Sequence, residues 1–256
     1  MKQLLTGKTA IVTGASKGIG LAIAELYAEE GANVVMTARG KDALEDAAAA
    51  INARGGGRAL AVVADSADPE APARVFKEAI DAFGQVDILV NNAGVGEMYA
   101  IEKTSTEHFD EIMQINLAGP FRFCREAVNH MMPRNEGRII NVSSVNGTKP
   151  ICGVAYTTTK GGINTMTLNI AIRLSGTKIR CNAIAPGVTD TDAARAWAAG
   201  EQEGGGEMLE FSDKYTNTTV PGTEPIDQAY AALYLASEMG RAVTGQVIQV
   251  DNGQFL

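Results

Sequence analysis

The chain has 256 residues, enough for one α/β domain with a sizeable core or for two small domains. Its formal net charge of -8 argues against a nucleic acid or an anionic membrane as partner. The three cysteines are widely spaced and there are only two histidines, so neither a disulfide framework nor a metal site is expected.

The sequence also predicts where the protein works. No uninterrupted apolar run reaches the ~18 residues of a membrane span. The first residues, Met-Lys-Gln-Leu-Leu-Thr-Gly-Lys, lack the apolar region of a signal peptide. Together with cysteines that read as reduced thiols, these features predict a cytoplasmic protein with no membrane contact.

Strands and helices alternate along the whole chain. Apolar segments of strand length lie at residues 9–13, 33–37, 59–64, 88–90, 138–142, 179–185 and 246–250. Helices are predicted at about 19–30, 41–54, 69–83, from 106 onward, at 156–174 and at about 224–236. Pro120 is expected to divide or kink the long helix that begins near Thr106. Because the strands are apolar on both sides, we predict a single-domain α/β fold with about seven parallel strands and helices on both faces.

One long segment, residues 188–223, has little periodic pattern. It contains Gly204-Gly205-Gly206, four glutamates and an isolated Trp197. A segment of this kind is more often a lid or binding loop than a mobile excursion. It also follows the carboxyl end of a strand, where α/β sheets bind ligands. We therefore expect a substrate lid at about 188–223.

Tyr156 and Lys160 are four residues apart in a predicted helix, so their side chains share one face. A tyrosine hydroxyl titrates near ~10, and lowering its pKa by ~3 units requires about 4 kcal/mol of preference for the phenolate. An ammonium about 4–5 Å away supplies roughly that much at an effective dielectric constant of ~20. The hydroxyl of Ser144, at a preceding strand end, could bind a substrate oxygen beside Tyr156. Tyr-x-x-x-Lys alone is usually an ordinary exposed helix face, and only its context favours a catalytic pair.

That context begins with a glycine-rich loop. Gly14, Gly18 and Gly20 join the first predicted strand to the first helix. Glycines there allow a tight turn and a close backbone approach, so the helix N-terminus can face a pyrophosphate. The spacing Gly-x-x-x-Gly-x-Gly departs from the standard dinucleotide fingerprint, so the loop alone fits an ordinary turn equally well.

Taken together, the motifs resemble the short-chain dehydrogenase/reductase family. Thr13-Gly14-x-x-x-Gly18-Ile19-Gly20, Asn91-Asn92-Ala93-Gly94, Asn116, Ser144, Tyr156-x-x-x-Lys160 and Pro186-Gly187 occur in the family's order. The resemblance covers nearly the whole chain. It implies a Rossmann-type, doubly wound sheet and hydride transfer between a nicotinamide cofactor and a ketone or secondary alcohol. It also implies a homo-oligomer, either a dimer or a tetramer.

The resemblance assigns roles to four residues. Tyr156 would be the general acid/base, and Ser144 would position the substrate oxygen. Lys160 would hold the nicotinamide ribose, and Asn116 would bind a water that relays protons towards it. Relatives commonly separate the catalytic serine and tyrosine by one residue more than Ser144 and Tyr156. Ser143 would restore that count, but Val-x-Gly after Ser144 matches the family, so we expect Ser144 and a one-residue deletion in the loop that follows.

By the same resemblance, a set of loop residues would contact the cofactor. Asp65 would accept a hydrogen bond from the adenine amino group, and Pro186-Gly187 would set the nicotinamide face. Thr191 would bind the carboxamide, with Thr189 touching it through its backbone. The expected contacts are Gly14, Ser16, Lys17, Gly18, Ile19, Gly20, Arg39, Asp65, Ser66, Asn92, Ala93, Gly94, Tyr156, Lys160, Pro186, Gly187, Thr189 and Thr191.

Charge after the second strand predicts which nicotinamide cofactor is used. An NAD site places a carboxylate there to hold the ribose 2′-hydroxyl, and that carboxylate repels a 2′-phosphate. This chain has Ala38 where similar NAD enzymes carry Asp, followed by Arg39, and Lys17 lies in the glycine loop. Both cations could be plain solvated charges. With the acid missing, they favour NADP(H).

The substrate is predicted less sharply. Pocket walls are expected at residues 95–99, 146–154 and the lid, lined by the apolar side chains Met98, Pro150, Ile151, Trp197 and Met208. The chain is similar to 3-oxoacyl-carrier-protein reductases, which tend to carry basic residues where Asn135 and Thr177 stand here, with Arg134 and Lys178 next door. The negative net charge disfavours an acidic carrier protein. We therefore favour a free ketone or secondary alcohol, such as a hydroxysteroid or small cyclic compound.

Three alternatives remain open. The first is a 3-oxoacyl-carrier-protein reductase. The second is a non-catalytic nucleotide-sensing protein on the same fold. The third is a methyltransferase-like protein, which would need neither Tyr156 nor Lys160.

Overall fold

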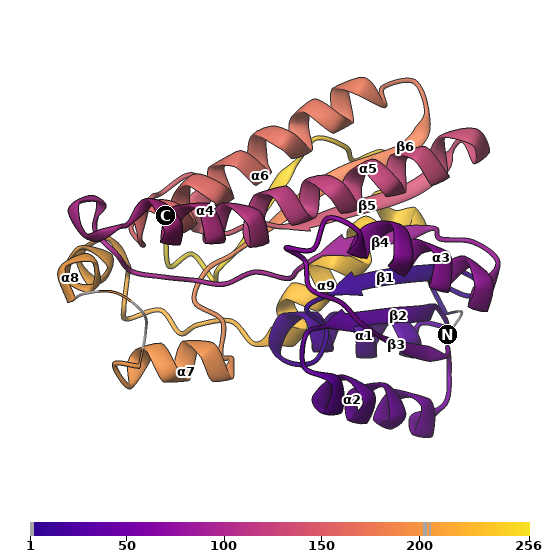
Figure 1. Cartoon of the computed structure of the whole chain (residues 1–256), viewed down its shortest axis with the longest axis horizontal. Helices are drawn as coiled ribbons and strands as arrows, with labels where there is room; N and C mark the ends of the chain where they lie inside the picture. The colour runs from indigo at the N-terminus through magenta and orange to yellow at the C-terminus, as the bar shows by residue number, and fades with distance from the viewer. Residues whose placement is uncertain (1–2, 202–203, 205) are drawn as a thin grey trace.

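The computed structural model describes residues 3–201, 204 and 206–256 (Figure 1). Its centre is one sheet of seven parallel strands, in the order β3-β2-β1-β4-β5-β6-β7. The strands are β1 (Thr9–Thr13), β2 (Asn33–Ala38), β3 (Ala59–Val63), β4 (Ile88–Asn91), β5 (Glu136–Val142), β6 (Lys178–Pro186) and β7 (Val247–Val250). The order reverses between β1 and β4, and ligands bind at the carboxyl ends of such a switch point. The doubly wound sheet predicted from the sequence is confirmed.

Helices cover both faces of the sheet. They are α1 (Gly18–Glu29), α2 (Lys41–Arg54), α3 (Ala71–Phe83), α4 (Thr106–Met113), α5 (Gly119–Met131), α6 (Val154–Arg173), α7 (Asp192–Ala198), α8 (Gly206–Tyr215) and α9 (Pro225–Ala236). Alternate residues of β1 enter different cores, because side chains alternate between the two faces of a strand. Val12 packs with α1, α2 and α9, whereas Ile11 packs with α3, α5 and α6. Within the described residues, no helix is both long and apolar enough to cross a bilayer.

The long helix expected from Thr106 is divided, as predicted, just before Pro120. A π-helical turn, Gln114–Ala118, separates α4 from α5. Pro120 lies in the first turn of α5, where its missing N–H costs little. A π-helical turn widens the helix locally and is frequent at functional sites. Here it carries Asn116, whose side chain is buried.

The segment 188–223 contains helices α7 and α8 and is more ordered than its sequence pattern predicted. Residues 202, 203 and 205 of this segment, including part of the glycine run, lie outside the described residues. A backbone bridge between Thr189 and Thr223 joins the two ends of the segment. Gln228 on α9 ties this bridge to the sheet, since its Nε2 donates to Thr223 Oγ1 and to Val250 O, both at 2.9 Å.

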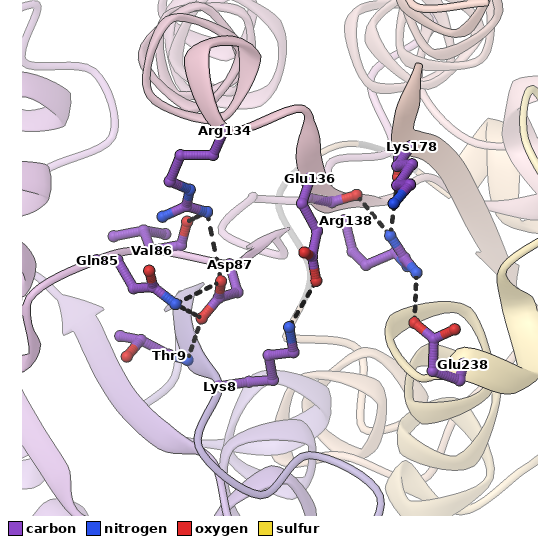
Figure 2. Close-up of polar contacts among 11 residues, drawn as sticks. Lys8, Thr9, Gln85, Val86, Asp87, Arg134, Glu136, Arg138, Lys178 and Glu238 are labelled. Carbon is purple, nitrogen blue, oxygen red and sulfur yellow. Dashed lines mark hydrogen bonds and ion pairs between the residues drawn. The ribbon is translucent and has the colours of Figure 1, made fainter. Parts of the chain in front are cut away.

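The amino ends of the strands are joined by ion pairs and hydrogen bonds (Figure 2). Asp87 is 4% exposed and accepts from Thr9 N at 3.0 Å and from Arg134 Nη2 at 3.3 Å. Arg134 Nη2 also donates to Val86 O at 2.8 Å. Nearby, Arg138 Nη2 reaches Glu238 at 3.0 Å. These contacts join the loops and strands at the amino ends of β1, β4 and β5.

Candidate active site

The glycine loop after β1 is shaped by close backbone contacts. Gly14 has a φ of +66°, a conformation that L side chains rarely adopt. A Cβ on Gly20 would overlap the Gly14 carbonyl oxygen and Asn92 Nδ2. Both glycines thus let the loops after β1 and β4 pack against each other at the N-terminus of α1, in the position where a pyrophosphate would bind.

The Asn91-Asn92-Ala93-Gly94 turn after β4 is fixed to this loop. Asn92 Nδ2 donates to Thr13 O at 3.0 Å and to Gly14 O at 3.1 Å. The Thr13 hydroxyl accepts from Asn92 N and Ala93 N, both at 3.0 Å. These hydrogen bonds join the loop after β1 to the turn after β4, and the two strands flank the switch point of the sheet.

The residues expected at the adenine end follow β2 and β3. Ala15 N donates to Thr37 O at 3.0 Å, which ties the glycine loop to the end of β2 just before Arg39. The side chains of Lys17 and Arg39 are exposed. Asp65 is also exposed, and its Oδ1 accepts from Ala67 N at 2.9 Å. The structure therefore lines these expected cofactor residues along the carboxyl edge of neighbouring strands.

Ser144, Tyr156 and Lys160 converge at the carboxyl end of β5. Ser144 is 5% exposed and is hydrogen-bonded to Tyr156. Lys160 is 6% exposed, its Nζ lies 5.4 Å from the Tyr156 ring centroid, and it donates to Val142 O at 2.9 Å. Ser143 faces elsewhere, because its hydroxyl donates to Lys160 O at 3.1 Å. The geometry favours Ser144 over Ser143 as the serine beside the tyrosine.

The expectation that the protein lowers the pKa of Tyr156 is wrong: the surrounding residues raise it. Burial raises the pKa of Tyr156 to about 12, although the hydrogen bond to Ser144 acts in the opposite direction. Burial also lowers the pKa of Lys160 to about 8. The prediction of a lowered pKa counted the attraction between the Lys160 ammonium and the Tyr156 phenolate. It omitted the loss of water around both groups. That loss is the larger effect here.

Asn116 is held by the backbone of Val95. Its Oδ1 accepts from Val95 N at 2.9 Å, and its Nδ2 donates to Val95 O at 2.7 Å. A Cβ on Gly94 would lie 3.1 Å from Asn116 Oδ1 and 3.8 Å from Lys160 Nζ. The π-helical turn thus brings Asn116 to Gly94 and Lys160. Its side chain fixes the loop after β4.

The residues after β6 divide into two groups. Thr191 lies at the glycine loop, since a Cβ on Gly18 would be 3.3 Å from its methyl group. Thr191 also caps α7 by accepting from Ala194 N at 3.2 Å. The side chain of Thr189, in contrast, is 3.0 Å from Thr223 Oγ1 and belongs to the base of the 188–223 segment. Gly187 N donates to Val250 O at 3.2 Å, which fixes the Pro186-Gly187 turn to β7.

The expected pocket walls are only partly brought together. Trp197 of α7 lies over the loop after β4, because a Cβ on Gly96 would be 2.5 Å from Trp197 Cζ2. Met98 is 1% exposed and Ile151 is 9% exposed, so both pack within the protein. Pro150 is exposed.

Two polar residues of the expected pocket walls, Asn146 and Glu97, were given no individual role from the sequence. Asn146 donates to Ser144 Oγ from its backbone N at 3.1 Å and from Nδ2 at 3.3 Å. Its Oδ1 accepts from Ile151 N at 3.1 Å and from Cys152 N at 2.9 Å. Glu97, in the loop after β4, is fully buried. The available signals were an amide two residues after the serine and an acid between the apolar residues Val95 and Met98.

The chain is similar to several known proteins. A family model described as short chain dehydrogenase matches residues 8–202. Glucose 1-dehydrogenase 2 of Bacillus subtilis is 36% identical, with 100% of this chain and 98% of that protein covered. The 3-oxoacyl-[acyl-carrier-protein] reductase FabG of Vibrio cholerae is 36% identical, with 98% and 99% covered. The 3beta-hydroxysteroid dehydrogenase 1 of Eggerthella lenta is 38% identical, with 98% and 95% covered.

Solved structures agree with these relatives. A dehydrogenase/reductase from Sinorhizobium meliloti 1021 superposes with a TM-score of 0.86 at 34% identity, covering 100% of this chain and 98% of that one. A 3-oxoacyl-[acyl-carrier protein] reductase from Brucella melitensis also reaches a TM-score of 0.86, at 28% identity, covering 100% and 94%. Among the described residues, no group of three histidine, cysteine or carboxylate side chains could hold a metal ion.

Proposed function

This chain belongs to the short-chain dehydrogenase family, and from that premise we propose an NADP(H)-dependent enzyme that acts on a ketone or secondary alcohol. Membership makes it an oxidoreductase of CH–OH and C=O groups with a nicotinamide cofactor. The observation that carries the proposal is the convergence of Ser144, Tyr156 and Lys160 beside the turn that follows β4.

The loops after β1 and β4 fit a dinucleotide. Because Gly14 and Gly20 carry no Cβ, the two loops pack closely at the N-terminus of α1, where backbone N–H groups would face the pyrophosphate. Gly94 leaves room beside Lys160 Nζ, where the ribose of the nicotinamide would be held. When bound, the nicotinamide supplies the hydride for reduction or accepts it in oxidation.

The protein residues would handle the proton. In reduction, Tyr156 donates its proton to the carbonyl oxygen, and a pKa of about 12 keeps it protonated at neutral pH. Ser144 Oγ accepts twice from Asn146, so its own hydrogen is left for Tyr156 or for the substrate oxygen. Lys160, with a pKa of about 8, carries a positive charge at pH 7. This charge stabilises negative charge that develops on the Tyr156 oxygen and on the substrate oxygen.

A single substitution tests this role. Tyr156→Phe should bind NADPH with unchanged affinity, measured by nucleotide fluorescence, and should lose nearly all turnover on any ketone that the wild type reduces. Unchanged turnover would remove Tyr156 from the mechanism. A wild type that binds NADPH but turns over no member of a broad panel of ketones and alcohols would favour the nucleotide-sensing alternative.

The NADP(H) preference is supported by charge at the end of β2. Ala38 provides no carboxylate to repel a 2′-phosphate, while Arg39 and Lys17 are exposed on loops that Ala15 N joins. Arg39→Asp should raise the KM for NADPH by about 10- to 100-fold and shift preference towards NADH, because a charge-assisted contact is lost and a repulsion is added. Arg54→Asp, at the far end of α2, is the matched control. Equal preferences in both variants would contradict the phosphate site.

The substrate class we propose is a free ketone or secondary alcohol, such as a hydroxysteroid or small cyclic compound. The positions where carrier-protein reductases tend to be basic serve local structure here: Asn135 Oδ1 accepts from Lys178 N at 3.1 Å, and Thr177 Oγ1 donates to Leu174 O at 2.6 Å. The neighbouring Arg134 is paired with Asp87 (Figure 2). A similar reductase of Vibrio cholerae keeps the alternative open. Comparing kcat/KM for cyclic ketones, 3-ketosteroids and acetoacetyl thioesters separates the two.

We also propose that residues 188–223 form a lid over the substrate site. Thr191, the N-cap of α7, lies at the glycine loop, and Trp197 of α7 lies over Gly96, so the segment lies between the nucleotide loop and the loop after β4.

A homo-oligomer, dimer or tetramer, is our proposal for the assembly. It is supported by Phe121 on α5 and by Leu168 and Ile172 on α6, which are 51%, 50% and 66% exposed.

The three cysteines all lie in the described part of the chain as buried free thiols, which fits a cytoplasmic protein.

A further inference from the structure

Glu97 joins the loop after β4 to the helix that carries Tyr156. Its side chain is 0% exposed. Oε1 accepts from Tyr156 N at 2.8 Å, and Oε2 accepts from Tyr99 N at 2.6 Å. The backbone follows the same path, because Gly153 N donates to Glu97 O at 3.0 Å and Val154 N donates to Tyr99 O at 3.2 Å. The buried Glu97 carboxylate thus accepts hydrogen bonds from backbone N–H groups of two segments, the loop after β4 and the start of α6.

These contacts replace the ordinary start of a helix. The first four N–H groups of a helix lack partners within it, and a side chain at the N-cap usually supplies one. The N-cap of α6 is Gly153, which has no side chain to offer. A Cβ on Gly153 would overlap both carboxylate oxygens of Glu97. The space of a local cap is therefore taken by Glu97 from the loop after β4.

The position of Glu97 bears on Tyr156 in two ways. The loop that holds it begins at Gly94, beside Lys160 Nζ, so the hydrogen bond to Tyr156 N fixes the tyrosine relative to the proposed nicotinamide side. A negative charge also lies at the positive end of a 20-residue helix, which stabilises that end. The negative charge of Glu97 also contributes to the raised pKa of the nearby Cys152 thiol.

We propose that Glu97 is a positioning residue for the reaction: it caps the catalytic helix from outside and sets Tyr156 against the loop after β4. The inference rests on the proposed catalytic role of Tyr156. Glu97 itself touches neither of the reacting oxygens, so its effect should reach turnover through Tyr156. The nucleotide half of the site, built from β1 and β2, should be unaffected.

Four variants test the proposal in the full-length protein. Glu97→Gln keeps the size and one acceptor but loses the charge, and it should lower kcat about 10-fold or more while the KM for NADPH changes less than about twofold. Glu102→Gln, an exposed acid in the same loop, is the matched control and should keep wild-type kcat. Glu97→Ala combined with Gly153→Asp moves the cap to its ordinary position and should recover most of the kcat lost by Glu97→Ala.

The pH profile provides a readout that a purely structural role would not move. Ser144 and Cys152 act on the Tyr156 hydroxyl, Lys160 Nζ lies 5.4 Å from the Tyr156 ring centroid, and Glu97 accepts from the Tyr156 backbone N–H. Removing the Glu97 charge makes the phenolate easier to form, so the profile of alcohol oxidation should move to lower pH in Glu97→Gln. An unmoved profile would contradict the electrostatic part of the proposal.

The outcomes separate this inference from the proposed function. If Tyr156→Phe abolishes turnover while Glu97→Gln keeps wild-type kcat, the positioning role is refuted and the catalytic role stands. If Tyr156→Phe retains turnover, the proposed function fails first. If Glu97→Ala does not fold, Glu97→Gln still decides, with circular dichroism to verify that it is folded. A folded double variant that recovers no kcat counts against capping as the mechanism.

Discussion

The close packing of Gly20 allows a prediction with a worked magnitude. In Gly20→Ala, the new methyl group would overlap Gly14 O and Asn92 Nδ2 and lie 2.9 Å from Gly14 C. Ordinary Cβ contacts begin near 3.4 Å. The amide of Asn92 would have to leave, and its hydrogen bonds to Thr13 O and Gly14 O, now 3.0 and 3.1 Å, would be lost.

The cost follows from these contacts. Two hydrogen bonds are worth roughly 2 kcal/mol, and forcing the Gly14 carbonyl aside adds about 1–3 kcal/mol. Alanine recovers about 1 kcal/mol through its higher helix propensity. The net loss is about 2–4 kcal/mol, which corresponds to a melting temperature roughly 8 °C lower for a chain of this size. The displaced loop should also weaken NADPH binding at least ~10-fold, because the backbone that faces the pyrophosphate has moved.

Differential scanning calorimetry and fluorescence titration with NADPH measure both effects. Gly161→Ala is the matched control, because its Cβ would meet nothing closer than Gly147 O at 3.7 Å. In the interior of α6 this alanine should stabilise the protein by about 0.5–1 kcal/mol. If Gly20→Ala melts within ~2 °C of the wild type and binds NADPH equally well, the overlap does not determine the loop.

Two further predictions concern pH and the opposite edge of the sheet. Because burial holds the pKa of Tyr156 at about 12 and lowers that of Lys160 to about 8, ketone reduction should vary little below pH ~7 and fall as Lys160 loses its charge, while alcohol oxidation should rise up to ~10-fold per pH unit as Tyr156 is deprotonated. An oxidation rate that levels off near pH ~7 would mean that bound cofactor lowers this pKa by several units. Asp87→Ala should cost about 3 kcal/mol in urea unfolding, because Thr9 N and Arg134 lose a buried acceptor. Glu238→Gln should change stability by less than ~0.5 kcal/mol, since that carboxylate is 77% exposed, and equal losses would contradict this assignment.

The sheet and its helices could be predicted from sequence because each strand is a short apolar run between turn residues. Residues 9–13, for example, were expected as a strand and form β1. Helices α7 and α8 were not predicted, because their sequences carry little apolar periodicity. They rest on contacts from outside the segment, such as Trp197 over Gly96. Tertiary contacts of this kind leave no local pattern.

The sequence predicted the site residues that belong to a motif. It did not predict properties that depend on the folded surroundings, such as pKa values and contacts between distant segments. The spacing of Tyr156 and Lys160 gave their shared face, but the pKa of each depends on how much water the whole fold removes. Glu97 was missed for a related reason. Its carboxylate bonds a backbone N–H that lies 59 residues away in the chain, and backbone groups are the same in every sequence.

The bridge between Thr189 and Thr223 has a consequence for engineering. Both ends of the intervening stretch are anchored to α9 and β7 through Gln228, so a replacement of the chain between the two threonines would keep these anchors. Lengthening a flexible loop is entropically mild, at about 0.6 kcal/mol for each doubling. Grafts from relatives with other substrates could therefore be inserted between the two threonines while the sheet beneath stays intact.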